Sequence, residues 1–356
     1  MKIKVLLLAI LTSTQLLCSC SPSKNSFEIK NGLNISHWLS QSSQRGEARK
    51  AYFTRSDVEF IAKQGYDHIR IPIDEEQMFT EDGNKDAEAF TLLHNALGWC
   101  AEFNLRAVVD LHILRSHHFN EGEKPLFTDA KAQEKFYECW RKISGELSKY
   151  SVDRIAYEPM NEPVADDHET WNVIVNRCVE VIRGLEPRRT IILGSNRWQS
   201  FNTVKFLRIP ENDPNIIISF HYYDPFLLTH YKASWTHTRD MAVPVHYPGQ
   251  LIDDADMEAA KNFANDGKKV YNIDVMENDF KQVIEVAKKY NLSLYCGEYG
   301  GINLAPPEDK IRWYKDMYTL FERHGIARAN WDYKGGFAIV SRGRPQTEMI
   351  NAILGK

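Results

Sequence analysis

The sequence contains few cysteines, and their spacing matches neither a disulfide framework nor a metal site. Beyond the first twenty residues only Cys100, Cys139, Cys178 and Cys296 remain, and no two of them form a Cys-x-x-Cys pair. A closed zinc site needs three or four ligands that converge, which this pattern does not provide. We therefore expect buried free thiols that act as small hydrophobic side chains, with no metal ion and no cofactor.

The chain also lacks a bias of charge. Its formal net charge is −4, positive and negative residues are interspersed, and there is no basic stripe, so nucleic acid is not an expected partner. After the N-terminal region no run is apolar enough to span a membrane, and there is no repeat or low-complexity segment. Hydrophobic residues make up 43% and charged residues 26%, which is typical of a globular domain with a large core.

Aromatic residues, in contrast, are plentiful at 12% of the chain. Clefts that bind sugars use such rings, because the C–H groups on a pyranose face pack against an aromatic plane. For any single ring, filling the core is the more common role.

The N-terminal region has the pattern of a secretory signal. Lys2 and Lys4 provide a short positive region, and Val5–Leu17 is an apolar run too short to span a bilayer comfortably. We therefore expect residues 1–19 to be a signal peptide that is not part of the fold. Simple cleavage that releases a free product is the alternative to the anchored form described next.

The end of this segment, Leu17-Cys18-Ser19-Cys20, is similar to a bacterial lipobox. Cys20 is the better candidate for lipidation, because a small residue is expected before the modified cysteine and Ser19 precedes Cys20. Residues 20–27 then form a polar tether. The sequence therefore predicts an exported bacterial lipoprotein, periplasmic or at the cell surface of the outer membrane, that contacts the membrane only through its lipid anchor.

Short apolar runs with strand character recur along the rest of the chain, separated by segments with helical periodicity. Several are continuous, as expected for parallel strands that are buried on both faces. The runs are Gly32–Ile35, His68–Ile73, Arg106–Leu111, Ile155–Glu158, Thr190–Gly194, Ile216–His221, Leu294–Glu298 and Ile326–Trp331. This alternation predicts an α/β fold, a (β/α)8 TIM barrel that spans residues 28–356.

One connection is too long for a simple unit of this barrel. Nearly 70 residues, about 224–291, separate the sixth and seventh predicted strands, whereas one strand–helix unit needs about 30. We interpret this segment as a small inserted subdomain over the barrel mouth. A role as a wall or lid of the cleft is favoured over inert decoration, because loops at this face of a TIM barrel line the active site.

Polar residues gather where the predicted strands end. In a TIM barrel these positions face one common site. They are Arg70 on the second strand, His112 after the third, Asn161 and Glu162 after the fourth, His221 and Tyr223 at the sixth, Glu298 at the seventh and Trp331 at the eighth. For one strand this would be unremarkable, but across the barrel it predicts a converging polar site.

The two glutamates fit the chemistry of glycoside cleavage. That reaction needs one protonated carboxyl group to donate to the leaving oxygen and one ionised carboxylate to attack the anomeric carbon. Glu162 and Glu298 would face each other across the barrel mouth, and Asn161 could hold the sugar 2-hydroxyl. Arg70 and Tyr223 could hydrogen-bond Glu298 and keep it ionised. His221 could lie near Glu162, and His112 and Trp331 would line the subsite of the attacked sugar.

These motifs together resemble glycoside hydrolase family 5, whose members are retaining (β/α)8 enzymes. The resemblance covers essentially the whole chain after the signal segment. It is carried by Asn31-Gly32-Leu33-Asn34, Gly65 with His68-Ile69-Arg70-Ile71-Pro72, Asp110-Leu111-His112, Met160-Asn161-Glu162-Pro163, His221-Tyr222-Tyr223, Cys296-Gly297-Glu298-Tyr299-Gly300 and Trp331-Asp332-Tyr333. The resemblance implies that Glu162 is the acid/base and Glu298 the nucleophile. Arg70, His112, Asn161, His221, Tyr223 and Trp331 correspond to the supporting pocket.

Two further segments, Phe220–His230 and His246–Gln250, are similar to bacterial endoglucanases that cut β-1,4- or mixed-linkage glucan and carry a subdomain after the sixth strand. The chain departs from many family members after His112. A second histidine is common there, but this chain has Ile113, with His117 and His118 following a few residues later. These two histidines either replace that contact or are loop residues only.

The expected function is therefore a retaining endo-β-glucanase that acts without cofactor, as a monomer. A second hypothesis keeps the mechanism and changes the substrate to mannan, xyloglucan or β-1,3-glucan. A third belongs to another class: a non-catalytic surface lipoprotein that binds glycans on a barrel that has lost activity. The presence of both Glu162 and Glu298 argues against the third.

Overall fold

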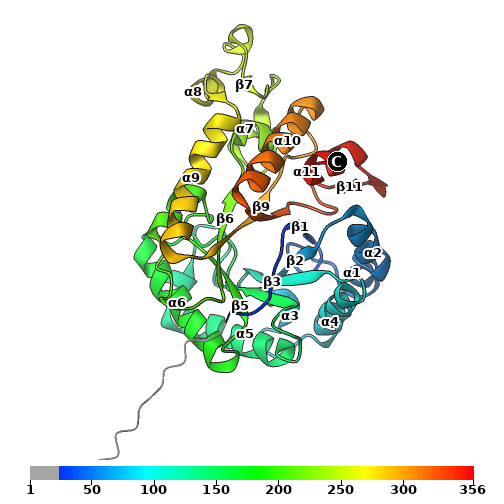
Figure 1. Ribbon diagram of the computed structural model, residues 1–356, viewed down its shortest axis with the longest axis vertical. Helices are drawn as coiled ribbons and strands as arrows, with labels where there is room; N and C mark the ends of the chain where they lie inside the picture. Colours follow the sequence, from blue (N-terminus) through cyan, green and yellow to red (C-terminus); the bar gives the residue numbers. More distant parts are fainter. Residues whose placement is uncertain (1–23) are drawn as a thin grey trace, which may run out of the picture.

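The structure is a computed structural model that describes residues 24–356. The predicted signal peptide, residues 1–19, and the predicted lipidation site, Cys20, lie outside the described residues. Within residues 24–356, parallel strands close into a barrel in the order β1-β10-β9-β6-β5-β4-β3-β2, and helices surround it (Figure 1). The predicted (β/α)8 TIM barrel is confirmed.

Each predicted strand run overlaps one strand of the barrel. The strands are β1 (Asn31–Asn34), β2 (His68–Asp74), β3 (Arg106–Ile113), β4 (Ile155–Glu158), β5 (Thr190–Gly194), β6 (Ile216–Tyr222), β9 (Ser293–Tyr299) and β10 (Ala327–Asn330). The bounds of β4 and β5 are the predicted ones, and those of the other strands differ by one or two residues. Trp331, for example, follows the last strand instead of ending it.

Helices follow most strands and cover the outside of the barrel. The α-helices are α1 (Gly46–Tyr52), α2 (Arg55–Gln64), α3 (Glu75–Met78), α4 (Ala87–Glu102), α5 (Ala130–Leu147), α6 (His168–Leu185), α7 (Phe226–Thr229), α8 (Ala264–Gly267), α9 (Ile273–Tyr290), α10 (Pro307–His324) and α11 (Thr347–Leu354). Local sequence explains where they begin. The side chain of Asp129 accepts a hydrogen bond at the start of α5, and Thr54 and Asp57 form a capping box on α2.

The inside of the barrel is layered because side chains alternate along each strand. On β4 Ala156 and Glu158 both point inward, and on β3 Val108 and Asp110 do the same. The lower layer is apolar and includes Val108, Ala156, Ile192, Ile217, Tyr295 and Ala329. Two residues further toward the carboxyl ends of β3 and β4, the buried acids Asp110 and Glu158 form part of the floor of the site described below.

The first described residues close the other end of the barrel. Phe27 is buried in the apolar layer inside the barrel, and the backbone N–H of Asn25 donates to Asn215 Oδ1 at 2.8 Å. Residues 25–27, predicted as part of the tether, therefore belong to the folded domain. An apolar side chain at position 27 is better placed against the open barrel end than in water.

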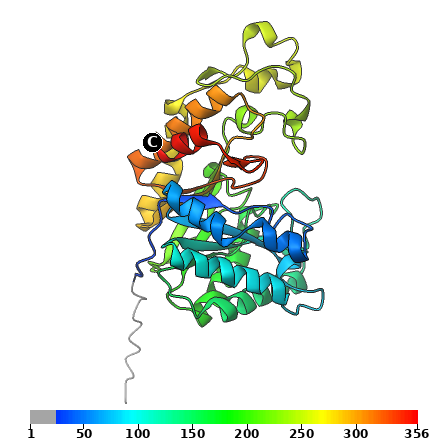
Figure 2. The ribbon, with the colours of Figure 1, turned by 90° about the vertical axis from the view of Figure 1, so that its right-hand side faces the viewer.

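The long connection after β6 is divided differently from the prediction. Its last part is α9, which packs against the 3-10 helix η2 (Phe201–Phe206) and against α10, as a helix of the outer ring. The additional segment is therefore residues 224–272, shorter than the predicted 224–291. It contains α7, α8 and the two-stranded sheet β7 (Gly249–Gln250) and β8 (Val270–Tyr271). Figures 1 and 2 show it projecting from one end of the molecule.

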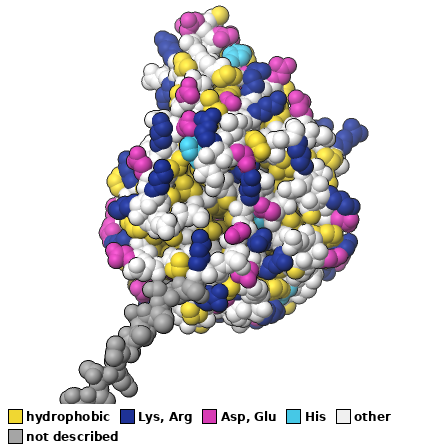
Figure 3. All heavy atoms as spheres, viewed as in Figure 1, with side chains coloured by type: hydrophobic (Ala, Val, Ile, Leu, Met, Phe, Trp, Pro, Cys, Tyr) yellow, Lys and Arg dark blue, Asp and Glu magenta, His cyan; other side chains and the backbone are white. Residues whose placement is uncertain are grey.

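The cysteine prediction is confirmed, because Cys100, Cys139, Cys178 and Cys296 are all free and buried. The face of the molecule in Figure 3 carries side chains of both signs, interspersed over its surface. Among the described residues, none of the helices combines the length and the apolar character needed to cross a bilayer.

Candidate active site

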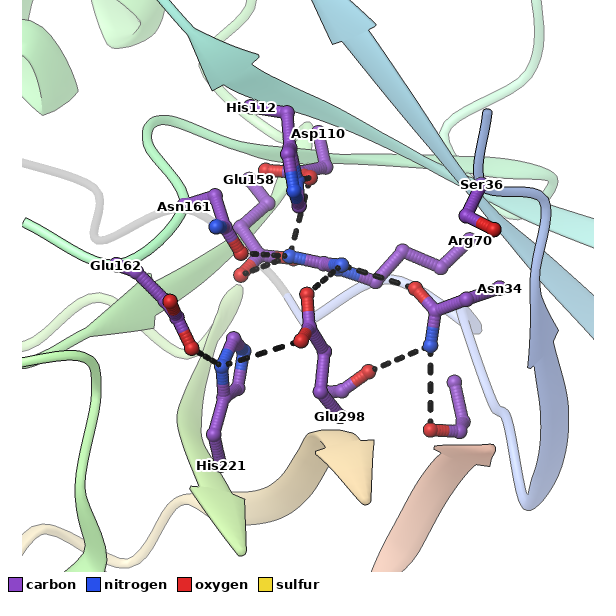
Figure 4. A network of polar contacts seen from close by, with 12 residues as sticks. Asn34, Ser36, Arg70, Asp110, His112, Glu158, Asn161, Glu162, His221 and Glu298 are labelled. Carbon is purple, nitrogen blue, oxygen red and sulfur yellow. Dashed lines mark hydrogen bonds and ion pairs between the residues drawn. The ribbon is translucent and has the colours of Figure 1, made fainter. Parts of the chain in front are cut away.

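Two glutamates face each other at the carboxyl ends of β4 and β9. Glu298 is the sixth residue of β9, and Glu162 lies in the loop after β4, with a left-handed backbone (φ 44°) that is uncommon for a side chain of this kind. One oxygen of each carboxyl group and one ring nitrogen of His221 lie within 4.8 Å of one another. His221 Nδ1 is 2.9 Å from Glu162 Oε1 and 3.7 Å from Glu298 Oε2, so it lies between the two carboxyl groups (Figure 4).

Arg70 is the buried cation beneath this pair. Its Nη1 donates to Glu298 Oε1 at 2.8 Å and to Asn34 Oδ1 at 2.9 Å. Its Nε is 2.7 Å from Glu158 Oε2, and its Nη2 is 3.0 Å from Asp110 Oδ2. The guanidinium therefore binds three carboxylates from three different strands, and its contact with Oε1 orients Glu298 (Figure 4).

The surroundings of the two glutamates shift their pKa values by different amounts. Burial raises the pKa of Glu162 well above its usual range, and the negative charge of Glu298 raises it further. Burial also raises the pKa of Glu298, but the guanidinium of Arg70 and the hydroxyl of Tyr223, which donates to Glu298 Oε2 at 3.0 Å, oppose that rise. The pKa of Glu298 is thus raised less than that of Glu162, so Glu298 is the carboxyl group that ionises first and Glu162 the one held protonated.

Asn161 is held so that its amide N–H groups remain available. Its Oδ1 accepts a hydrogen bond from Arg70 Nη2 at 2.9 Å. Its Nδ2 is buried and has no partner among the described residues, and Asn161 lines the cleft beside Glu162. A donor at this position can bind a substrate hydroxyl, as the sequence prediction requires.

His112 and Trp331 form one wall of the site. Their rings are stacked, with centroids 5.6 Å apart and an angle of 9° between the planes. Asp110 Oδ2 accepts from His112 Nδ1 at 2.6 Å, so His112 Nε2 is the acceptor for the amide of Gln41, whose Nε2 lies 2.9 Å away. Burial lowers the pKa of His112 to about 3, which keeps this ring neutral.

These side chains open into a cleft of about 890 Å³. The cleft is lined by seven of the predicted site residues, and Arg70 lies directly beneath it. The additional segment after β6 contributes Phe226, His230, Trp235 and His237 to one wall. The segment predicted to lie over the barrel mouth does therefore line the cleft.

The two histidines after Ile113 take different places. His117 is buried, and its Nε2 is 3.2 Å from the backbone oxygen of Glu162, so it supports the loop that carries this glutamate. His118 lines the cleft and stacks on Phe119 with ring centroids 4.7 Å apart. Ile113 also lines the cleft.

Several residues of the site were not found from the sequence. Glu158 is a fully buried acid in a strand, and its alternation with Ala156 was an available signal. Gln41, Trp198 and Trp235 lie in loops of no regular pattern, and only the tertiary structure brings them to the cleft. Trp198 and Trp235 are 46% and 57% exposed, which is unusual for such large apolar side chains.

Among the described residues, one group could also be considered as metal ligands, namely Glu162, His221 and Glu298. The guanidinium of Arg70 already contacts Glu298 at 2.8 Å, and this fixed positive charge opposes a second cation at the same carboxylate. The arrangement fits proton transfer and nucleophilic attack by a carboxylate better than metal binding.

Comparison with known proteins agrees with this geometry. The model of the cellulase family, glycosyl hydrolase family 5, matches residues 28–336. Endoglucanase C of Acetivibrio thermocellus is 32% identical over 323 residues, which cover 86% of this chain and 91% of that protein. Cellodextrinase A of Ruminococcus flavefaciens is 32% identical over 304 residues, 84% of each chain. Among solved structures, an endoglucanase superposes with a TM-score of 0.76 at 25% identity, covering 92% of this chain and 97% of its own.

Proposed function

Because the chain belongs to the cellulase family, glycosyl hydrolase family 5, it is an O-glycoside hydrolase, and we propose that it cleaves β-1,4- or mixed-linkage glucan internally. The proposal of this substrate is supported by the names of its relatives, which include endoglucanases and a cellodextrinase matched over most of their lengths. Glu298 is the proposed nucleophile and Glu162 the proposed acid/base.

The observation that carries the mechanism is the short separation of the two carboxyl groups. Oxygen atoms of Glu162 and Glu298 lie within 4.8 Å of each other. Retaining glycosidases place these groups about 5–5.5 Å apart, whereas inverting enzymes need about 6.5–9.5 Å to admit a water molecule between carboxylate and sugar. The separation supports a double displacement.

In the first step a carboxylate oxygen of Glu298 attacks the anomeric carbon, and the bond from this carbon to the leaving oxygen breaks. Glu162 transfers its proton to that oxygen, so the leaving chain departs as a neutral alcohol. In the second step the Glu162 carboxylate accepts a proton from water while the water oxygen attacks the anomeric carbon and releases Glu298. Asn161 is placed to hold the 2-hydroxyl of the attacked sugar, through an N–H that has no other partner.

The exposed tryptophans of the cleft support a chain substrate over a small molecule. Trp198 and Trp235 lie in different loops, and both line the same cleft as the glutamates. Flat aromatic faces that remain open to solvent beside a polar centre suit the C–H faces of successive sugar rings. We assign both tryptophans to binding of sugar rings of the chain along this cleft.

The proposal is tested by incubating the protein with barley β-glucan, carboxymethylcellulose, mannan, xyloglucan and β-1,3-glucan. Products are separated by chromatography, and proton NMR follows which anomer forms first. We expect the two β-1,4-containing glucans to be cut fastest, into several oligosaccharides, with the β-anomer appearing first. Initial formation of the α-anomer would contradict the roles of Glu298 and Glu162, and binding of glucan without any cleavage would favour the non-catalytic hypothesis.

Variants of the two glutamates test their proposed catalytic roles. Glu298→Ala and Glu162→Ala are expected to fold and to lose at least about 10²-fold in turnover, since each removes a reacting group. Glu134→Ala is the matched control, because its side chain on α5 is 63% exposed and lies outside the cleft. Added azide should restore turnover of an activated aryl glycoside by Glu162→Ala with a β-azide product, and full activity of either catalytic variant would reject the assignment.

We also propose that the protein is exported, lipidated at Cys20 and monomeric. Labelling of cells with a fatty acid analogue, followed by purification, should mark the wild-type protein and leave Cys20→Ala unlabelled. Light scattering of the released domain should give the mass of one chain. An unlabelled wild-type protein would reject the anchor.

A further inference from the structure

The loop after β5 has an unusual backbone beside the acid/base glutamate. Arg197, Trp198 and Gln199 follow one another with positive φ angles of 61°, 58° and 51°. None of them is glycine or asparagine, the residues that adopt this conformation with least strain. Such a run persists only where the surrounding structure holds it, and it is concentrated at functional sites.

Gln199 is the residue of this run that points into the protein, and it is fully buried. Its Oε1 accepts a hydrogen bond from the backbone N–H of Glu162 at 3.2 Å. Its Nε2 donates to Glu158 Oε1 at 3.0 Å. The amide orientation is determined by chemistry, because a backbone N–H requires an acceptor and a carboxylate requires a donor.

The backbone of the same loop makes hydrogen bonds to His221, which contacts Glu162, and to Pro163, which follows Glu162 in the sequence. The carbonyl oxygen of Gln199 accepts from the N–H of His221 at 2.8 Å, and the N–H of Trp198 donates to Pro163 O at 3.3 Å. The ring of His221 contacts the carboxyl group of Glu162. Gln199 therefore holds the backbone of Glu162 and also the backbone of the residue whose side chain touches the carboxyl group of Glu162.

The last residue of β5 leaves the space that Gln199 occupies. A Cβ atom at Gly194 would lie 1.8 Å from Gln199 Nε2 and 2.4 Å from its Cδ. A side chain at position 194 would therefore displace the amide. Gly194 is thus the position from which the same contact can be disturbed without changing Gln199 itself.

From this arrangement we propose that Gln199 is a positioning residue for proton transfer by Glu162, which it places by holding the left-handed backbone of that residue. The inference rests on the proposed acid/base role of Glu162. A second route leads from Gln199 through Glu158 and Arg70 to Glu298, the proposed nucleophile. The two routes differ in one measurable property, because only proton transfer depends on how much the leaving group needs a proton.

The experiment compares kcat/KM for phenyl cellobioside, whose leaving group needs a proton, and 2,4-dinitrophenyl cellobioside, whose leaving group departs without one. The value of kcat/KM is used because it reports only steps up to formation of the glycosyl-enzyme. Gln199→Met keeps the length of the side chain and removes both hydrogen bonds. Gly194→Ala disturbs the same amide from the strand, and Glu158→Gln is the control for the route to the nucleophile. Circular dichroism and Tm verify the fold of each variant.

We expect Gln199→Met and Gly194→Ala to lose at least about tenfold with phenyl cellobioside and less than about threefold with the dinitrophenyl substrate, since misplacement of a reacting group by about 1 Å can cost about 100-fold. Glu158→Gln should slow both substrates by the same factor. Equal losses on both substrates for Gln199→Met, or no loss on either, would overturn the inference. Glu162→Ala distinguishes a failure of this inference from a failure of the proposed function. If Glu162 is the acid, Glu162→Ala must itself lose more activity with phenyl cellobioside than with the dinitrophenyl substrate.

Discussion

Replacement of Arg70 by methionine tests the central electrostatic argument of the site. Methionine fills much of the same space and removes the charge that binds Glu298, Glu158 and Asp110, at 2.8, 2.7 and 3.0 Å. These carboxylates are buried, so water cannot replace the guanidinium. The variant should therefore lose stability as well as activity.

The size of the loss follows from the burial. Removing one partner of a buried ion pair costs about 3–5 kcal/mol. The three pairs share one guanidinium, so their contributions do not add, and we expect a loss of about 4 kcal/mol at pH 7. Without Arg70 the pKa of each of the three carboxyl groups rises, because the guanidinium lowers all three.

The rise of these pKa values makes the loss of stability in Arg70→Met depend on pH. The variant will bind at least one proton more than the wild type in its folded state near neutral pH, and each pH unit then changes the difference in stability by about 1.36 kcal/mol per proton. Because the folded variant binds the extra proton, lowering the pH stabilises the variant relative to the wild type. Between pH 7 and pH 5 the loss should therefore shrink by up to about 2.7 kcal/mol for one extra proton.

The assay is urea unfolding of wild type and Arg70→Met, followed by circular dichroism at pH 5 and pH 7. Arg49→Met is the matched control, because Arg49 is equally buried but its partners Asp86 and Glu88 are 32% and 28% exposed and can be hydrated. Arg49 lowers the pKa of Glu88, so its contribution is constant between these pH values, above the range in which Glu88 titrates. A loss for Arg70→Met that is independent of pH, or no larger than that of Arg49→Met, would refute the reasoning.

Three further predictions follow from other contacts. The pKa of Glu162 is raised in the folded protein, so the wild type loses stability as the pH rises from about 4.3, the value in the unfolded chain, through the value in the folded protein. Glu162→Gln should be inactive yet exceed the wild type in Tm by a margin that grows above about pH 4. A margin that is independent of pH would contradict this argument. Trp235→Ala should raise KM for cellopentaose about fivefold, as expected for one lost ring contact, and leave kcat unchanged; an unchanged KM would remove Trp235 from the binding surface. Asp110→Ala should lower kcat and let the ring proton of His112 move from Nδ1 to Nε2, because it removes the oxygen that accepts from Nδ1, and nitrogen NMR detects this move. Retention of the Nδ1 proton would show that Asp110 does not set this tautomer.

The difference between residues found from the sequence and residues missed has a physical pattern. Glu298 and His221 lie within strands of strong β character, and Asn161 and Glu162 follow a few residues after β4, so their place could be predicted once the fold was. Parallel strands in a closed barrel bring all carboxyl ends to one face, and strand-end position then becomes spatial proximity. The sequence by itself therefore determined the fold class and the two facing glutamates.

The tertiary structure decided what surrounds those glutamates. Gln199 has a left-handed backbone, which the residue types of its segment do not predict. Its contacts with Glu158 and Glu162 form only because the barrel closes. Trp198 and Trp235 reach the cleft from loops without periodicity, and α9 is separated from the additional segment only by its packing in the outer ring. Periodic patterns report burial against a neighbouring element, whereas contacts between irregular loops depend on distances that are defined only after the chain has folded.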